Sequence, residues 1–333
     1  MHIAIVILNW NGVTLLESYL PSVTQYSEGA EIYVADNAST DSSVAFIKTN
    51  YPTIKIIQNS TNGGFAKGYN DALKHVDADL LCLLNSDVEV TENWIEPIKN
   101  AFVELPNVSI IQPKILDLKQ RDHFEYAGAA GGFIDQLGYP FCRGRIFQVL
   151  EKDKGQYDDV HEIFWATGAC MFIKKELFES LGGFDEDYFA HQEEVDLCWR
   201  AKNQGHKVYY VGASKVYHLG GSTLNNMNPK KTYLNFRNSL FSITKNLPRR
   251  KAFTIIAIRL LLDGVAAMRF VLQLKFSHCF AILRAHLSFY VHFRTMYRKR
   301  EKDNFILNYY STRSIVWSHF VHHKNTYDIL TKN

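Results

Sequence analysis

Residues 3–12 read IAIVILNWNG, six consecutive apolar residues that run into a polar stretch and a glycine. A short β-branched run bounded by such residues is typical of a buried strand. We expect further strands at 31–35, 54–58, 79–84 and 108–114, separated by helices at 12–25, 42–50, 63–75 and 91–104. Strands alternating with helices of this length predict an α/β fold with a doubly wound, mostly parallel sheet.

The pattern after residue 115 is less regular. Residues 117–160 are rich in glycine, with Gly128, Gly131, Gly132, Gly138 and Gly144 among them, and read as loops or a short hairpin excursion. A strand is expected at 163–174, a helix at 175–181, a helix at 193–204 and a strand at 207–211. A polar stretch with one proline at 225–231 marks the boundary to a different kind of sequence, so we expect domains at 1–229 and 230–333.

The charge is divided unevenly between these two parts. Residues 230–333 hold 19 Lys and Arg against 4 Asp and Glu, a balance of +15, whereas residues 1–229 have a balance of −12. The segments at 252–274 and 276–293 are mostly apolar but carry Arg259, Asp263 and Arg269, among other charged residues. A transmembrane helix tolerates such charges poorly. Basic amphipathic helices of this kind favour a membrane interface, with a helical appendage or a homodimer contact as the alternative. Nucleic acid is disfavoured as a partner, because the basic residues are interleaved with Ile, Leu and Phe.

The five cysteines are odd in number and widely spaced, with no Cys-x-x-Cys pair. This predicts reduced thiols rather than a disulfide framework or a zinc site. The N-terminus runs directly into the first strand with no signal-peptide pattern, so we expect a cytoplasmic protein at the inner face of the membrane.

Three carboxylates crowd the start of the predicted helix at 193–204: Glu193, Glu194 and Asp196. Like charges this close repel, so a fold keeps them together as a general base, a metal site or a structural ion pair. Arg200 is available as an ion-pair partner, and we assign Asp196 to helix capping and to Arg200.

Polar motifs also follow the predicted strands, where open α/β sheets bind their ligands. Asp36 ends the second strand, and a glycine-rich stretch at 62–70 opens a helix whose N–H groups suit anions. Asn85 and Asp87 come just after a buried strand, and His218 lies further along the chain. Oxygen ligands of this kind suit Mg²⁺ or Mn²⁺ on a diphosphate.

Together these motifs resemble family 2 inverting glycosyltransferases. The matching stretches are VILNWNG at 6–12, DNASTD at 36–41, NGGFA at 62–66, NSD at 85–87 and EEVDL at 193–197, in the family's order over residues 1–240. The branch that they resemble most is that of bacterial rhamnosyltransferase-like enzymes of surface-polysaccharide synthesis. The resemblance implies a GT-A fold, a nucleotide-sugar donor and a divalent metal.

The resemblance also implies residue roles. Asp87 and His218 would hold the metal, and Glu194 would be the catalytic base where the family more often has Asp, with Glu193 as the alternative. The donor-binding residues would be Asn9, Asp36, Asn37, Asn62, Gly64, Phe65, Asn70 and Asn85.

The implied function is inverting transfer of a hexose, with L-rhamnose from dTDP-rhamnose as the first choice, to a hydroxyl of a lipid-linked or oligosaccharide acceptor. A UDP-hexose donor is the alternative within the same fold. A non-catalytic nucleotide-sugar-binding protein is the alternative outside enzymology, and the retained Glu193, Glu194 and Asp87 count against it.

Overall fold

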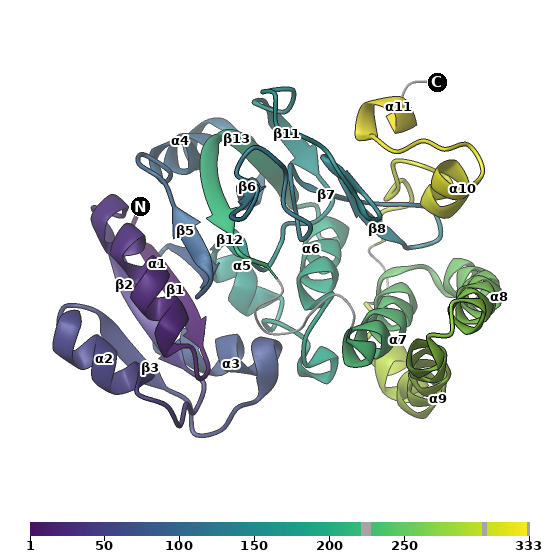
Figure 1. The fold of residues 1–333 in the computed structure, drawn as a ribbon, viewed down its shortest axis with the longest axis horizontal. Helices are drawn as coiled ribbons and strands as arrows, with labels where there is room; N and C mark the ends of the chain where they lie inside the picture. The colour runs from purple at the N-terminus through teal and green to yellow at the C-terminus, as the bar shows by residue number, and fades with distance from the viewer. Residues whose placement is uncertain (221–227, 302–304, 332–333) are drawn as a thin grey trace.

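The computed structural model describes residues 1–220, 228–301 and 305–331. Its first part is the predicted alternation, with four parallel strands in the order β3-β2-β1-β4. The strands are β1 (Ile3–Asn9), β2 (Ala30–Asp36), β3 (Lys55–Gln58) and β4 (Leu80–Asn85). The helices between them are α1 (Val13–Tyr26), α2 (Ser43–Asn50) and α3 (Gly64–Leu73). Figure 1 shows β1, β2 and β3 with α1, α2 and α3 grouped around the N-terminal part of the chain.

Helices cover both faces of the sheet, as a doubly wound arrangement requires. Leu16 and Leu20 of α1 pack with Ile5 of β1 in one hydrophobic cluster. Tyr69 of α3 packs with Val6, the next residue of the same strand, in another. Successive side chains of a strand point to opposite faces, so α1 and α3 lie on opposite sides of β1.

The rest of the sheet is mixed. β12 (Cys170–Lys174) lies antiparallel between β4 and β6 (Val108–Asp117), and β13 (Lys207–His218) runs parallel to β6. β5 (Val88–Val90) and β11 (Val160–Ile163) pair antiparallel with β13, and α4 (Glu96–Glu104) precedes β6. The predicted α/β class is therefore confirmed, as a mixed and mostly parallel sheet.

The single strand predicted at 163–174 is wrong, because the chain leaves the sheet between β11 and β12. There the chain makes an isolated bridge between Trp165 and Gly132, and the backbone of the next two residues bonds to side chains. The Ala166 amide donates to Cys198 Sγ at 3.4 Å, and the Thr167 amide donates to Gln112 Oε1 at 2.9 Å. The strand predicted at 207–211 continues to His218, which brings that histidine to the edge where β4 ends.

The glycine-rich segment 117–160 forms a small antiparallel sheet in the order β10-β9-β8-β7. Its strands are β7 (Gly132–Ile134), β8 (Pro140–Cys142), β9 (Arg145–Ile146) and β10 (Val149–Leu150). The predicted hairpin excursion is thus present, and it is longer than a single hairpin.

The remaining elements are mostly helical. α5 (Lys175–Ser180), the 3₁₀ turn η1 (Glu186–Tyr188) and α6 (Glu193–Asn203) precede β13. They are followed by α7 (Pro229–Asn246), α8 (Arg249–Leu272), α9 (Phe276–Arg298), α10 (Ile315–Phe320) and α11 (Tyr327–Thr331). Figure 1 shows α7, α8 and α9 grouped on the side of the molecule away from α1 and α2.

The C-terminal helices share their core with the sheet. Leu240 of α7, Ile255 of α8 and Phe289 of α9 belong to the hydrophobic cluster that also contains Tyr69 of α3. Within the described residues, no helix is long and apolar enough to cross a membrane. Arg259 and Asp263 of α8 lie one turn apart on the same face of the helix, and that face is buried, with exposures of 2% and 0%.

Candidate functional site

The carboxyl ends of β1 and β2 bring the first group of predicted residues together. Asn9 pairs with Asp36 in the parallel register, and both side chains are buried. The Asn9 amide nitrogen donates to Asp36 Oδ1 and to Ser39 Oγ, each at 3.3 Å, while the Ser39 amide donates to Asp36 Oδ2 at 3.0 Å. Asn9 Oδ1 is buried and bonds to no described residue. These bonds fix the Asp36 carboxylate at the end of its strand.

A second network joins this edge to the start of α3. The Asn37 amide nitrogen donates to Asn62 Oδ1 at 2.9 Å and to the Gly64 carbonyl at 3.1 Å. The Gly64 amide in turn donates to Asn62 Oδ1. Gly64 has a φ of +81°, and a Cβ there would lie 2.7 Å from the Phe189 carbonyl oxygen. Only glycine fits this position without strain.

Phe65 and Asn70 have structural contacts. The Phe65 ring packs edge-on against Tyr69 and Phe184, with centroids 4.8 and 5.6 Å apart. The Asn70 side chain donates to the Phe184 carbonyl and accepts from the Phe184 amide. Asn70 therefore anchors the segment before η1 to α3, and the structure does not bring its side chain to the strand-end residues.

Asp87 and His218 meet at the end of β4. His218 Nε2 lies 3.1 Å from Asp87 Oδ1, and Glu125 Oε2 lies 3.4 Å from the other ring nitrogen. All three side chains are buried. Burial alone would lower the pKa of His218, but the carboxylates of Glu125 and Asp87 outweigh it and raise this pKa to about 10. Asn85 ends β4 next to this cluster, and its amide donates to the Ala169 carbonyl.

This cluster fits a divalent cation only in part. Among the described residues, no group of three or more His, Cys, Asp and Glu side chains is arranged to hold a metal ion. Asp87 and His218 would supply two ligands, and Glu125 would orient the imidazole from its far side, as carboxylates do for metal-bound histidines. The chemistry of the donor set therefore suits an ion that takes its remaining ligands from a diphosphate.

Glu193 and Glu194 begin α6. Burial, with the neighbouring Glu194 charge, raises the pKa of Glu193 well above its usual range. Burial also raises the pKa of Glu194 to about 7, although backbone N–H groups at the helix start oppose the shift. One oxygen of each carboxylate is buried and bonds to no described residue. A carboxylate with these properties is suited to accept a proton near neutral pH.

Asp196 behaves differently from this pair. It receives hydrogen bonds from Arg200 Nε, Lys245 Nζ and Asn246 Nδ2, each at 2.8 Å. Although burial opposes the shift, Lys245 and Arg200 lower the pKa of Asp196 far below its usual range. Asp196 forms the expected ion pair with Arg200 inside the protein. It does not cap the helix, because α6 has no side-chain cap hydrogen bond.

The loop at 188–192 leads directly into the two glutamates. Phe189, His191 and Gln192 have φ values of 64°, 68° and 67°, a left-handed region that is costly for residues other than glycine. The Phe189 carbonyl accepts a hydrogen bond from the Phe65 amide at 3.0 Å. The loop therefore touches the start of α3, next to the Asn37 network.

Two features of this region were not predicted from the sequence. Glu125, from the glycine-rich segment, completes the His218 environment, and no local pattern distinguishes it from a surface glutamate. Trp10 is 52% exposed and follows Asn9 at the strand edge. A tryptophan left exposed beside buried polar residues was the signal that could have singled it out.

Comparison with known proteins is consistent with this geometry. Residues 4–182 match the family profile described as Glycosyl transferase family 2, more than half of the chain. The chain belongs to glycosyl transferase family 2. It is thus a nucleotide-sugar-dependent glycosyltransferase, and the family resemblance of its motifs is confirmed.

Two relatives illustrate the range of this family. The N-acetylglucosaminyl-diphospho-decaprenol L-rhamnosyltransferase of Mycobacterium tuberculosis is 26% identical over 222 residues, covering 61% of this chain and 71% of the relative. The low-salt glycan biosynthesis hexosyltransferase Agl10 of Haloferax volcanii is 23% identical over 257 residues, covering 75% and 79%.

Solved structures of similar fold also carry donors and metals. Staphylococcus aureus TarS 1–349 with UDP-GlcNAc has a TM-score of 0.57 and 16% identity, over 87% of this chain and 80% of that one. The mannosyltransferase PcManGT of Pyrobaculum calidifontis, with GDP-Man and Mn²⁺, has a TM-score of 0.53 and 12% identity, over 87% of both. At these identities the likeness establishes the GT-A-like fold alone.

Proposed function

We propose that this protein transfers a sugar from a nucleotide diphosphate to an acceptor hydroxyl in one inverting step, with Glu194 as the general base. The observation that carries the proposal is the pair Glu193 and Glu194. Glu193 is buried and Glu194 is half-buried at the start of α6, and each has an oxygen that bonds to no described residue. Burial raises the pKa of Glu193 well above its usual range and that of Glu194 to about 7. Structural carboxylates are instead paired, as Asp196 is.

In this mechanism the chain's own residues orient the two substrates and deprotonate the acceptor hydroxyl. Glu194 accepts the proton of the acceptor hydroxyl as that oxygen attacks the anomeric carbon, and the bond to the diphosphate breaks on the opposite side. Proton removal of this kind contributes about 10²–10⁴-fold in rate. Asp87 and His218 would hold Mg²⁺ or Mn²⁺, which neutralises the charge of the leaving diphosphate when bound. Asp36 would contact the nucleotide base or ribose.

We propose dTDP-L-rhamnose as the donor and a lipid-linked or oligosaccharide acceptor in cell-surface polysaccharide synthesis. Support comes from the rhamnosyltransferase of M. tuberculosis, whose name describes a decaprenol-diphosphate acceptor. A UDP-hexose donor is the second candidate, favoured by the hexosyltransferase Agl10 and by the UDP-GlcNAc complex of TarS.

The deciding experiment measures nucleoside diphosphate release from a panel of dTDP-, UDP- and GDP-sugars with Mg²⁺ or Mn²⁺. Glu194→Gln and Glu193→Gln are run beside the unchanged protein. A single preferred donor, with the rate lost in Glu194→Gln, supports the proposal. Glu193→Gln inactive with Glu194→Gln active would move the base to Glu193. Tight donor binding with no release or transfer would instead support the non-catalytic reading.

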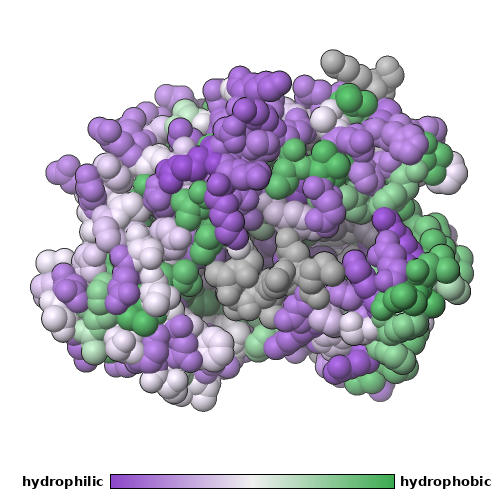
Figure 2. Space-filling model, in the orientation of Figure 1, coloured by the Kyte–Doolittle hydropathy of each residue, from purple (hydrophilic) through white to green (hydrophobic). Residues whose placement is uncertain are grey.

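We further propose that the protein works as a peripheral protein at the cytoplasmic face of the membrane, bound through α8 and α9. The exposed apolar residues of the two helices recur at intervals of three or four, which places them on one face of each helix. They are Leu261, Val265, Met268 and Leu272 on α8, and Phe276, Phe280, Leu283, Leu287 and Val291 on α9. Figure 2 shows this hydrophobic surface along the side of the molecule where Figure 1 places α8 and α9. It is here named the outer face.

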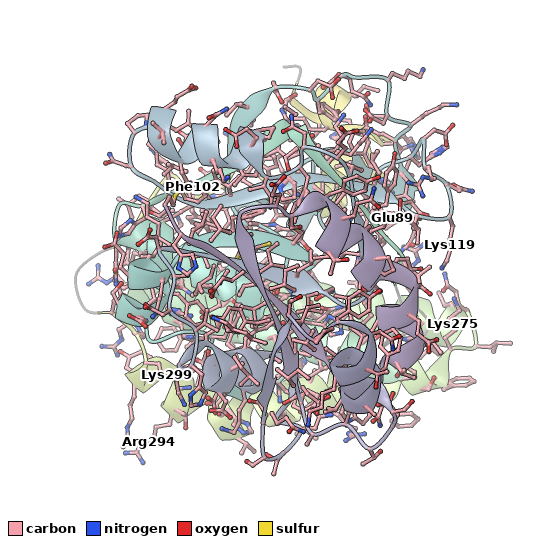
Figure 3. The ribbon with its side chains drawn as sticks, turned by 90° about the vertical axis from the view of Figure 1, so that its left-hand side faces the viewer. Glu89, Phe102, Lys119, Lys275, Arg294 and Lys299 are labelled. Carbon is pink, nitrogen blue, oxygen red and sulfur yellow. The ribbon has the colours of Figure 1, made fainter. Side chains whose placement is uncertain are left out.

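Basic residues surround the outer face. Arg269, Arg284, Arg294 and Arg298 are exposed on the same two helices, and Lys275 lies at the turn between them. Figure 3 shows Lys275 and Arg294 extending outward on opposite sides of the molecule. Apolar residues surrounded by Lys and Arg suit the surface of an anionic bilayer, where each well-placed basic residue contributes about 1 kcal/mol.

The membrane proposal is tested by co-sedimentation with vesicles of phosphatidylcholine, alone or with phosphatidylglycerol. Binding should need the anionic lipid and weaken with salt. Leu261→Asp with Val265→Asp should abolish it, whereas the control Val103→Asp on exposed α4 should not. Failure of the unchanged protein to bind either vesicle, with dimers in solution that the double variant dissociates, would favour the homodimer alternative.

A further inference from the structure

The 188–192 loop is held from the side of α7 by two adjacent residues, Arg237 and Asn238. Asn238 is fully buried, and its amide nitrogen lies 3.1, 3.0 and 2.7 Å from the carbonyl oxygens of Tyr188, Ala190 and His191. One side-chain NH₂ group thus serves three carbonyls of a five-residue loop.

Arg237 fixes the orientation of that amide. Its Nε donates to Asn238 Oδ1 at 2.9 Å, so the oxygen of Asn238 faces the guanidinium and the nitrogen faces the loop. Arg237 Nη2 also donates to the carbonyls of Asp187 and Tyr188, at 3.0 and 3.1 Å. A planar guanidinium provides these three bonds at once in a way that an ammonium group does not.

The loop needs this support because its backbone is strained. The left-handed φ values at Phe189, His191 and Gln192 are unfavourable for residues with a Cβ, so surrounding contacts must maintain them. On the opposite side the Phe189 carbonyl binds the Phe65 amide at the start of α3. The loop is therefore fastened between the donor side of the site and α7.

Within the described part of the chain, the two glutamate carboxylates are supported by backbone N–H groups at the start of α6, such as those of Gln192 and Val195 beside Glu194, and not by a side chain of another element. Oε2 of Glu193 and Oε2 of Glu194 are buried and bond to no described residue, so their positions follow from the backbone that precedes them. Since His191 and Gln192 immediately precede Glu193, a change in their φ and ψ angles redirects both carboxylates.

We propose that Asn238 and Arg237 are positioning residues, which hold the 188–192 loop in the conformation that presents the base to the acceptor hydroxyl. This inference rests on the proposed function of the glutamate pair. The inference adds a structural requirement to the role of the two glutamates. The start of α6 keeps its active geometry only while the side chains of Arg237 and Asn238 donate hydrogen bonds to the loop carbonyls.

The test compares Asn238→Asp with a matched control, Asn203→Asp, in the full chain. The first substitution keeps the size of the side chain but replaces the donating nitrogen with a carboxylate oxygen that repels three carbonyls. Asn203 is also buried, and its nitrogen donates to the Asn246 carbonyl at 3.3 Å. It lies at the other end of α6, so its loss disturbs packing without touching the loop.

Two measurements are made on each variant: kcat with the donor found by the nucleotide-sugar panel, and amide hydrogen exchange of residues 188–194. Asn238→Asp should lower kcat by about 10²-fold, speed exchange of the loop, and leave the Kd for UDP or dTDP with Mn²⁺ within about threefold. Asn203→Asp should keep kcat within about twofold. Arg237→Lys, a milder change, should lower kcat by about 10-fold and serves if Asn238→Asp does not fold.

Unchanged kcat or unchanged loop exchange in a folded Asn238→Asp protein would overturn the inference. Equal losses of kcat in Asn238→Asp and Asn203→Asp would overturn it as well, since a general packing defect would then explain both. If Glu193→Gln and Glu194→Gln both keep full activity, the base assignment fails. Hydrogen exchange would still report in that case whether Asn238 holds the loop.

Discussion

Replacing Glu194 by Gln should make the protein slower and more stable at the same time. The substitution keeps the shape of the side chain but removes a carboxylate that burial disfavours in its charged form. We expect kcat to fall by about 10²-fold or more, because an amide cannot accept the proton of the hydroxyl. The gain in stability should depend on pH in a direction set by the pKa shift.

Burial raises the pKa of Glu194 from 4.5 to about 7 in the folded protein. A raised folded-state pKa of an acid means that the protonated form is favoured in the fold. Ionisation therefore subtracts stability as the pH rises from about 4.5 to about 7, and the loss is complete above that range. The shift corresponds to at most about 3 kcal/mol, and about 1–2 kcal/mol is expected because part of the side chain reaches solvent.

The assay is urea unfolding of the unchanged protein and of Glu194→Gln at pH 5 and at pH 8. The variant should be more stable than the unchanged protein at pH 8, and the difference should shrink at pH 5. Exposed Glu104→Gln on α4 is the control, with a difference near zero at both values. A stability difference that is constant between pH 5 and pH 8, or larger at pH 5, would refute the reasoning.

The same shift predicts the pH dependence of the reaction. The base must be ionised, so kcat should fall as the pH drops below about 7. Because Glu193 and Glu194 influence each other, the profile should show apparent pKa values of the pair rather than of one residue. In Glu193→Gln the neighbouring charge is removed, and the acid side of the profile should become a single step.

The other predictions concern the metal, the loop contact and the donor. EDTA should abolish activity and Mg²⁺ or Mn²⁺ should restore it, and Asp87→Ala should cost far more activity than Asn85→Ala; full activity in chelator would contradict the metal assignment. Gly64→Ala should lower the free energy of unfolding by about 1–3 kcal/mol, measured by urea, because the new Cβ meets the Phe189 carbonyl in a left-handed conformation; an unchanged stability would contradict this. Trp10→Ala should raise KM for the donor about 10-fold with kcat nearly unchanged, since an exposed indole stacks on bases; unchanged KM would remove Trp10 from the donor site.

The strand-and-helix alternation was predictable because each element is a local hydrophobic pattern. The run at 163–174 shows where such patterns stop being sufficient. It is mostly apolar, yet the amides of Ala166 and Thr167 bond to the side chains of Cys198 and Gln112, which lie more than thirty residues away. A strand needs a continuous neighbouring strand to bond to, and only the tertiary structure shows that the pairing here is reduced to an isolated bridge between Trp165 and Gly132.

The candidate site likewise contains residues that the sequence could indicate and residues that only the tertiary structure shows. Asp36, Asp87, Glu193 and Glu194 belong to short motifs, so the sequence alone singles them out as candidates. Asn238 depends on contacts with residues some fifty positions earlier in the chain. The only sequence signal for it is a polar pair within a helix whose neighbouring positions are largely buried. The sequence contains no comparable signal for Glu125. Its contact with His218 exists because β13 extends to residue 218, and the sequence predicted a strand that ends at 211.

The α8 helix raises a question that its sequence could not answer, namely which of its faces meets the protein. The charged residues Arg259 and Asp263 are 2% and 0% exposed, whereas Leu261 and Leu272 are 75% and 79% exposed. Asp263 is satisfied within the protein by Tyr139 and His286, so its burial is compensated. If the outer side of α8 faced water, the free-energy cost of exposing the leucines would not be compensated. That cost is about 25 cal/mol per Å² of apolar area. A helix with charged residues facing the protein and leucines facing outward is explained if its outer side meets a lipid surface. The Asp substitutions at Leu261 and Val265 are therefore the sharpest test of membrane binding.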